Sequence, residues 1–105
     1  MKHYEVLISE KANKDMEAIY DYIAETFCSP ITAIKQYDRI AEAILSLEEM
    51  PERIKLMNSE PERSKGLRSL IVDNYSIFFV IKPETVLIIR VLYSASDICK
   101  RLAEK

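Results

Sequence analysis

The sequence predicts an α+β fold: an N-terminal strand, an antiparallel helical hairpin, then a three-strand antiparallel meander. Apolar residues recur every three or four positions through most of the first half of the chain, as they do along one face of a helix. The second half instead contains three segments rich in Ile, Val, Leu, Phe and Tyr, which is typical of strands. The chain has 105 residues, and we expect residues 1–105 to form a single domain.

The first two elements follow from two different periodicities. Residues 2–8 place Tyr4, Val6 and Ile8 on one side of an extended segment, which predicts a short strand. Ser9 is a suitable helix cap, and the helix after it should end near residues 27–28. Its apolar stripe consists of Ala12, Met16, Ile19, Ile23 and Phe27.

A second helix should start at once. Ser29 offers a capping hydroxyl, and Pro30 suits the first helical position because that position needs no N–H donor. The apolar stripe of this helix is Ala33, Tyr37, Ile40, Ile44 and Leu47. Residues 50–51 close it with a proline. Because the link between the two helices is short, we expect them to lie antiparallel.

The rest of the chain predicts a long exposed connection and then a meander. Residues 51–66 hold two prolines and the only glycine, which is typical of a loop. Asp73 and Asn74 tolerate the positive φ of a tight hairpin turn. The predicted strands are residues 67–72, 75–82 and 85–93, and residues 96–102 should form a short last helix. The hairpin would cover one face of the sheet and leave the other partly open.

The composition excludes several classes of site. A single glycine rules out glycine-rich phosphate loops, and one histidine with two distant cysteines rules out common zinc and redox motifs. We therefore expect no cofactor, no metal and no small-molecule substrate. No apolar run approaches the roughly 18 residues of a membrane span, and the start lacks the long apolar stretch of a signal peptide. A cytoplasmic location without membrane contact is the expectation.

Charge is distributed unevenly along the chain. Residues 1–50 carry 5 basic and 10 acidic side chains, whereas residues 51–105 carry 10 basic and 7 acidic ones. The segment 53–68 alone has five basic and two acidic residues. An acidic front half and a mildly basic back half suggest different partners for different faces, but on charge alone solvated helix faces and ordinary surface charge are the favoured explanation.

The last strand carries the strongest candidate site residues. Arg90 interrupts an apolar strand, and an unpaired guanidinium cannot be buried cheaply. Arg68 occupies a comparable position in an earlier strand, and two arginines on one face would bind a phosphate or carboxylate. Tyr93 ends the same strand and should point to the face of the sheet opposite Arg90. Its hydroxyl offers a weak acid or base, and its ring offers a surface on which a base can stack.

Structural roles compete with these functional ones. Arg90 could instead form a salt bridge with Asp97, with Asp73 or with an acidic residue of a helix. Tyr93 could be an ordinary amphipathic residue at the edge of the sheet.

Three segments together resemble the RelE/ParE superfamily of bacterial toxins. They are GLRSL at 66–70, NYSIFFV at 74–80 and RVLYSASD at 90–97. The order of strand, two helices and meander agrees, so the resemblance covers nearly the whole chain. It implies the growth-inhibiting toxin of a type II toxin–antitoxin pair, bound by a cognate antitoxin. RelE-like members cut messenger RNA on the ribosome, whereas ParE-like members inhibit DNA gyrase.

The sequence departs from the ribonuclease pattern where that pattern is basic. Ser76 follows Tyr75 where RelE-like enzymes have a basic residue, and Ala95 and Ser96 stand where the family commonly ends in basic residues. Such groups stabilise the charge of phosphodiester attack. The remaining catalytic candidates are Arg68, Arg90 and Tyr93, and the candidates for binding a target or nucleic acid are Lys65, Arg68 and Arg90.

Three functions therefore compete. The first is a ParE-like inhibitor that binds a protein target, DNA gyrase, without catalytic chemistry of its own. The second is a ribosome-dependent messenger RNA endoribonuclease. The third is a degenerate member that binds its antitoxin and poisons nothing. All three imply an antitoxin as partner.

Overall fold

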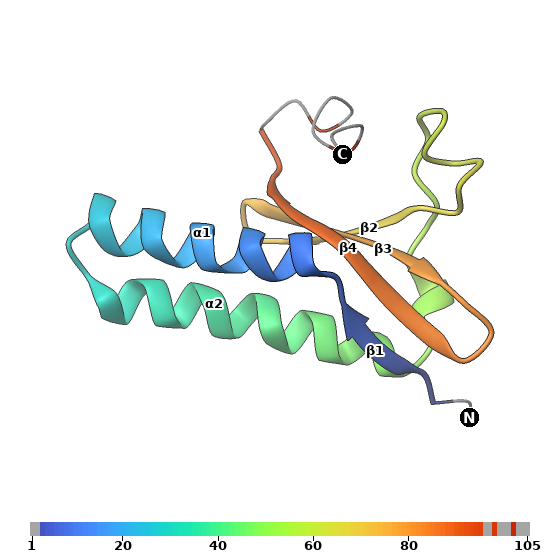
Figure 1. The fold of residues 1–105 in the computed structure, drawn as a ribbon, viewed down its shortest axis with the longest axis horizontal. Coiled ribbons are helices and arrows are strands. Elements are labelled where there is room, and N and C mark those ends of the chain that lie inside the picture. The colour runs from blue at the N-terminus through green and yellow to red at the C-terminus, as the bar shows by residue number, and fades with distance from the viewer. Residues whose placement is uncertain (1–2, 96–97, 99–101, 103–105) are drawn as a thin grey trace.

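The computed structural model describes residues 3–95, 98 and 102, and it combines a helical hairpin with a four-stranded sheet (Figure 1). The elements are β1 (Glu5–Ile8), α1 (Glu10–Thr26), α2 (Pro30–Leu45), β2 (Arg68–Val72), β3 (Tyr75–Ile81) and β4 (Thr85–Tyr93). Two single 3-10 turns, Ser46–Glu48 and Pro51–Arg53, follow α2. The predicted fold class and element order are confirmed. The predicted last helix over 96–102 lies mostly outside the described residues.

The sheet has the order β1-β4-β3-β2. β2, β3 and β4 form the predicted antiparallel meander, whereas β1 runs parallel to β4 and pairs with its first half. The first strand of the chain therefore lies beside the last, as Figure 1 shows. Within the described residues, no helix is long and apolar enough to span a lipid bilayer.

The predicted caps and turn are present. The Ser9 hydroxyl accepts a hydrogen bond from the Ala12 N–H at 3.1 Å and begins α1. The Ser29 hydroxyl accepts one from the Thr32 N–H at 3.2 Å, and Pro30 starts α2. At the β2–β3 turn, Asp73 takes a φ of 56°, which an aspartate tolerates better than most residues.

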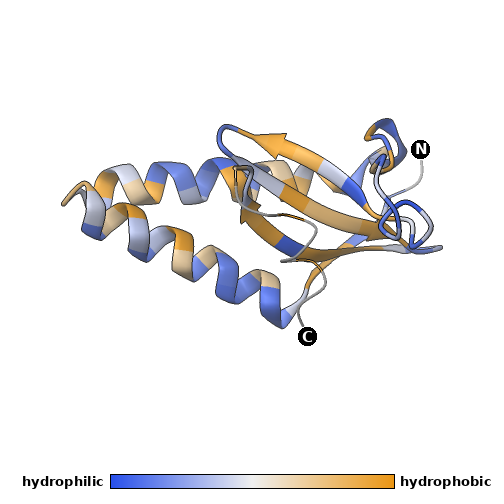
Figure 2. Cartoon of the chain, turned by 90° about the horizontal axis from the view of Figure 1, so that it is seen from above, coloured by the Kyte–Doolittle hydropathy of each residue, from blue (hydrophilic) through white to orange (hydrophobic). Residues whose placement is uncertain are grey.

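The main core lies between the helical hairpin and one face of the sheet. Its fully buried side chains include Ala12, Ala33 and Ile40 from the helices and Ile77, Phe79, Val86 and Ile88 from the sheet. Figure 2 shows the strands as mainly hydrophobic ribbons and the helices as mixed ones. This distribution is expected when helices cover a sheet from one side only.

The opposite face of the sheet is less open than the sequence suggested. Leu67, Phe78 and Leu92 form a second buried cluster there. Met57 of the 51–66 connection packs against this cluster, and so do Ile98 and Leu102. Part of this face is therefore a second small core.

The connection between α2 and β2 has a defined course. The Met57 N–H donates to the Leu67 carbonyl at 2.9 Å, and Glu62 is only 5% exposed while it accepts a 2.6 Å bond from the Ser59 hydroxyl. Gly66 has a φ of 80°, a conformation that only glycine adopts without strain. The loop is thus held in place by its own hydrogen bonds.

Candidate functional site

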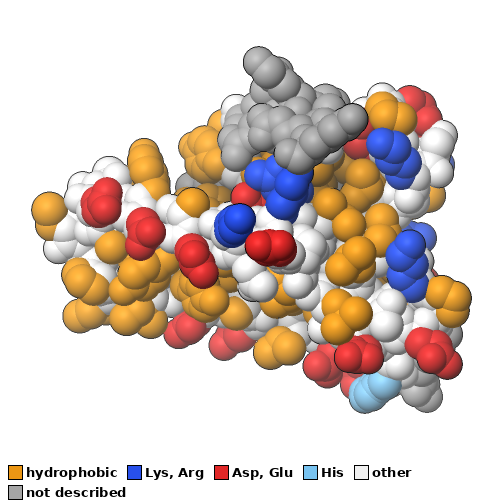
Figure 3. Space-filling model, in the orientation of Figure 1, with side chains coloured by type: hydrophobic (Ala, Val, Ile, Leu, Met, Phe, Trp, Pro, Cys, Tyr) orange, Lys and Arg blue, Asp and Glu red, His pale blue; other side chains and the backbone are white. Residues whose placement is uncertain are grey.

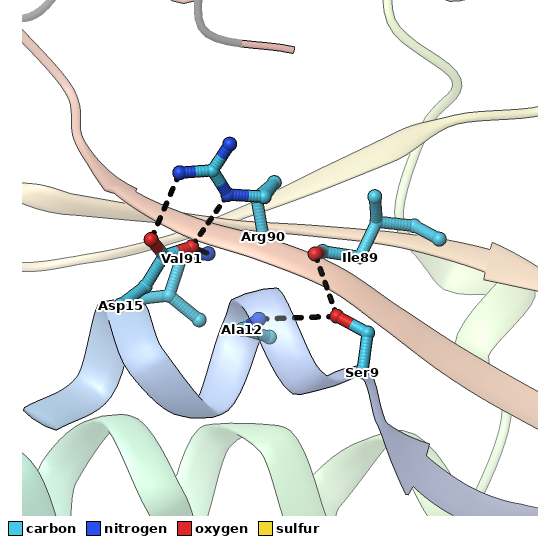
Figure 4. A network of polar contacts seen from close by, with 6 residues as sticks. All are labelled: Ser9, Ala12, Asp15, Ile89, Arg90 and Val91. Carbon is cyan, nitrogen blue, oxygen red and sulfur yellow. Dashed lines mark hydrogen bonds and ion pairs between the residues drawn. The ribbon is translucent and has the colours of Figure 1, made fainter. Parts of the chain in front are cut away.

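Arg90 forms a buried ion pair with an acidic residue of a helix. Its Nε lies 2.7 Å from Oδ2 of Asp15, and its Nη2 lies 2.9 Å from Oδ1 (Figure 4). The two side chains are only 10% and 11% exposed. Among the partners considered for Arg90, the one that the structure shows is an acidic residue of a helix, Asp15 in α1. A bidentate pair of this kind is the arrangement that lets a guanidinium stay inside a fold.

The same carboxylate also closes an edge of the sheet. β1 ends at Ile8, so the outer edge of β4 beyond Ile88 has no neighbouring strand. The start of α1 takes its place: the Ser9 hydroxyl donates to the Ile89 carbonyl at 2.8 Å, and Asp15 Oδ2 accepts from the Val91 N–H at 3.0 Å (Figure 4). Asp15 and Arg90 are therefore part of the scaffold that joins α1 to β4.

Arg68 does not join Arg90. In the sheet Arg68 is opposite Phe79, whereas Arg90 is opposite Phe78. Consecutive residues of a strand point to opposite faces, so the two arginines lie on opposite sides of the sheet. The Arg68 guanidinium instead donates to the Ile54 carbonyl at 2.5 Å and holds the loop before β2.

The predicted two-arginine anion site on one face is therefore wrong. The reason is the register: a shift between Phe78 and Phe79 sets how β4 pairs with β3, and this shift cannot be counted from the sequence.

Tyr93 and Arg90 lie on opposite faces of the sheet, as their odd spacing of three residues along β4 predicts. Tyr93 lies opposite Tyr75, with ring centroids 5.8 Å apart and planes at 66°, and it is 52% exposed. Burial raises the pKa of the Tyr75 hydroxyl, and the nearby Tyr93 and Tyr22 raise it further. Tyr93 thus belongs to a group of tyrosines at one end of the sheet.

The last predicted site residue, Lys65, is exposed in the turn before Gly66. Its backbone N–H donates to the Pro61 carbonyl at 3.1 Å. Arg68, Arg90 and Tyr93 thus sit in three separate environments, and only Lys65 and Tyr93 present a largely exposed side chain. In the described part of the chain, no three His, Cys, Asp or Glu side chains are grouped as a metal site would require.

Two surface hollows lie beside α2 and are lined by residues other than the predicted site residues. One, of about 430 Å³, lies between α2 and β2, and Arg39 and Asp73 form part of its wall. Arg39 binds the Asp73 carboxylate through Nε at 2.7 Å and Nη2 at 3.0 Å. Hydrogen bonds from Arg39 and Gln36 hold the pKa of Asp73 below its ordinary value. This ion pair joins positions 34 residues apart, so no local pattern in the sequence could have indicated it.

The other hollow, of about 290 Å³, lies on the helical hairpin and is lined by Tyr20, Ile34, Tyr37 and Asp38. Tyr37 was placed in the apolar stripe of α2, yet it is 39% exposed and borders this groove. The signal that could have found the groove is the number of apolar residues on α2, which exceeds what one buried stripe needs.

Comparison with known proteins identifies the family. The chain resembles a solved structure of the chromosomal ParDE toxin–antitoxin system from P. aeruginosa, with 26% identity, a TM-score of 0.73, and coverage of 87% of this chain and 96% of that one. It also shares its fold with the toxin–antitoxin complex RelBE2 from Mycobacterium tuberculosis, with 23% identity, a TM-score of 0.63, and coverage of 91% and 97%. No curated protein sequence matches it. The family model of the ParE toxin of the type II toxin–antitoxin system parDE matches residues 6–98. The chain therefore belongs to the ParE toxin family of type II toxin–antitoxin systems.

Proposed function

We propose that this ParE-type toxin inhibits growth by binding a protein target, DNA gyrase, and that a cognate antitoxin neutralises it. The observation that carries the proposal is the Arg90–Asp15 pair. The arginine best suited to stabilise a phosphate during RNA cleavage is already bound to a carboxylate inside the fold, so it is not presented to a substrate.

The other candidates for ribonuclease chemistry support the same proposal. Cleavage of a phosphodiester needs a base, an acid and donors placed around one phosphate. Arg68 and Tyr93 are not brought to Arg90, and Ser76, at the position that is basic in RelE-like enzymes, shares a 2.8 Å hydrogen bond with the Ser94 hydroxyl. An inhibitor that acts by binding requires no such arrangement.

The proposed antitoxin follows from the family and from the neighbours. The P. aeruginosa ParDE structure and the RelBE2 structure are described as toxin–antitoxin systems or complexes. By analogy we assign this chain a protein partner that binds its exposed surface and blocks access to the target.

A supercoiling assay with purified gyrase tests the proposal. We expect the chain alone to reduce supercoiling in proportion to its concentration, and preincubation with the antitoxin encoded beside it to restore activity. Unchanged supercoiling at a large excess of the chain would refute the gyrase target.

Induction of the chain alone in a bacterium, with pulse labelling, separates the alternatives. A gyrase inhibitor should stop DNA synthesis first. Early loss of protein synthesis, with new cleavage sites in messages that vanish in Tyr93→Phe, would favour the ribonuclease. Unaffected growth with intact antitoxin binding would favour the degenerate member.

A further inference from the structure

The connection before β2 displays positive charge on an otherwise acidic protein. The whole chain carries 17 acidic and 15 basic side chains, whereas residues 53–68 carry five basic and two acidic ones. Three of these basic side chains, Lys55, Arg63 and Lys65, are exposed. Within the described part of the chain, none of the three takes part in an ion pair. Below we call the surface formed by these three residues the basic connection.

The two other arginines of the segment hold its backbone in place. The Arg53 guanidinium donates to the carbonyls of Glu49 and Met50 at 2.7 and 3.0 Å. The Arg68 guanidinium donates to the Ile54 carbonyl from the other side of the segment. The three exposed cations are therefore carried on a backbone that is already fixed, which lowers the entropy cost of binding a partner.

The two acidic side chains of the same segment are occupied by hydroxyl groups. Glu62 is only 5% exposed and accepts a hydrogen bond from Ser59, so it presents little negative charge to the surface. Glu60 accepts a hydrogen bond from the Ser64 hydroxyl. The exposed cations of the segment therefore outnumber its exposed acids.

The acidic residues outside the segment are placed elsewhere. Glu49 lies 3.4 Å from the His3 ring, and Glu52 accepts a hydrogen bond from the Tyr4 hydroxyl, so both contact the residues at the start of the chain. The acidic hairpin is farther away, because the connection lies at the end of the molecule opposite the α1–α2 turn (Figure 1). Figure 3 shows acidic side chains over the outer part of the hairpin, and Lys and Arg side chains over the connection.

The basic connection has no large apolar anchor on its exposed side. Leu67 is buried, and Met57 packs against the second cluster. Between residues 54 and 66, all exposed side chains except Pro61 are polar or charged. Protein interfaces depend mostly on a few large side chains packed into pockets, whereas lysine, arginine, serine and asparagine side chains are typical contacts of phosphate oxygens. This surface therefore fits a phosphate backbone better than a pocket of a protein.

We propose that the basic connection contacts the phosphate backbone of the duplex DNA on which gyrase acts, while the toxin is bound to gyrase. This inference rests on the proposed gyrase target. Duplex DNA carries one negative charge per about 1.7 Å of its axis, so cations on a fixed loop meet phosphates without contacts to particular bases. Binding releases counterions from those phosphates, which makes the contribution of the contact strongly dependent on salt.

Binding of the fluorescently labelled chain to purified gyrase, with and without a linear DNA duplex, tests the inference. For wild type we expect the duplex to strengthen binding about tenfold at low salt. The double variant Lys55→Ala, Lys65→Ala should lose most of this gain and keep its affinity for gyrase alone within about threefold of wild type. Arg63 is left unchanged because its guanidinium also donates to the Met57 carbonyl, at 3.5 Å.

A matched control and a salt series make the test specific. Lys14→Ala, Lys35→Ala removes the same charge from exposed positions of the hairpin and should keep the full gain from the duplex. On logarithmic axes, the affinity of wild type for the gyrase–DNA complex should fall more steeply with salt than that of Lys55→Ala, Lys65→Ala, by a slope of about 2 for two lost phosphate contacts. Circular dichroism melting checks that each variant is folded.

The outcomes separate this inference from the proposed function. Wild type that binds gyrase neither with nor without the duplex refutes the gyrase target, and with it the DNA contact. Wild type that binds gyrase without any gain from the duplex, or a gain that Lys55→Ala, Lys65→Ala retains in full, overturns the DNA contact alone. Equal weakening of this double variant with and without the duplex would assign the basic connection to an acidic surface of gyrase itself and overturn the inference as well.

Discussion

Arg90 keeps a full positive charge in the interior of the molecule because Asp15 supplies two acceptor oxygens to it. The desolvation cost of both groups is offset only while they remain together, so removal of one partner strands the other. The Asp15 carboxylate is committed further, since it also accepts from the Val91 N–H. The role that these contacts indicate for the pair is therefore structural: while both partners are present, it holds α1 against β4.

Substitution of either partner should destabilise the protein strongly. We expect Asp15→Asn and Arg90→Met each to lower the free energy of unfolding by about 3–5 kcal/mol, because each leaves a buried charge unpaired. The double variant Asp15→Leu, Arg90→Met should recover much of this loss. Urea unfolding measures all of them, and strictly additive effects would contradict the coupling.

Asp73 and Arg39 form a second ion pair, exposed to solvent, whose effect depends on pH. The pKa of Asp73 is lower in the folded protein than in the unfolded chain, because Arg39 and Gln36 bind its charged form. The unfolded chain thus takes up the proton first as pH falls, and the stabilisation is lost. It is fully present above the ordinary aspartate pKa of about 4 and disappears as pH drops through the lowered value.

The variant Asp73→Asn isolates this charge, since asparagine also tolerates the φ of 56° at this turn. We expect its melting temperature to lie slightly below that of wild type at pH 7 and to converge with it at strongly acid pH. A difference that persists unchanged at strongly acid pH, where the carboxylate is protonated, would show that its charge is not the cause.

At the scale of elements, the junction between β1 and α1 does most to define the fold. β1 has only four residues, and the chain turns directly into α1 while it remains against β4. The Ser9 hydroxyl accepts from Ala12 and donates to the Ile89 carbonyl, so one side chain caps a helix and ties it to a strand 80 residues away.

Ser9→Ala should therefore cost more than the loss of a cap alone. We expect a decrease of about 2 kcal/mol in the free energy of unfolding, from the lost cap and the unpaired carbonyl. Ser29→Ala is the matched control, because the Ser29 hydroxyl caps α2 with no bond to the sheet in the described contacts, and about 1 kcal/mol is expected. Equal losses in the two variants would show that the Ser9–Ile89 bond contributes nothing.

Local signals in the sequence were enough to predict the elements. The caps at Ser9 and Ser29 and the turn at Asp73 depend on a few adjacent residues, so they are readable from the chain alone. The position of β1 was not, since its pairing with β4 joins residues 80 apart, such as Glu5 and Thr85. The relative placement of Arg68 and Arg90 could not be predicted for the same reason, because the face that each arginine occupies depends on the register of three strands.

At the scale of the molecule, the uneven charge along the sequence becomes a difference between two regions of surface. The hairpin presents Glu17, Asp21 and Asp38, whereas the connection before β2 presents Lys55, Arg63 and Lys65. The second is a candidate for the target, as the sequence predicted for Lys65.

The last prediction concerns this basic connection. Hydrogen bonds such as that from the Arg68 guanidinium to the Ile54 carbonyl fix its backbone. A partner that binds the exposed Lys65 therefore has to order little more of the loop, and the entropy cost of binding is small. We expect Lys65→Glu to raise the concentration for half-inhibition of gyrase about tenfold at low salt, and to leave antitoxin affinity within about threefold of wild type. Lys82→Glu, on the exposed β3–β4 turn, is the matched control. A Lys65→Glu protein that is folded and inhibits as well as wild type would remove this connection from the target interface, whereas a parallel loss of antitoxin binding would mean that target and antitoxin share one surface.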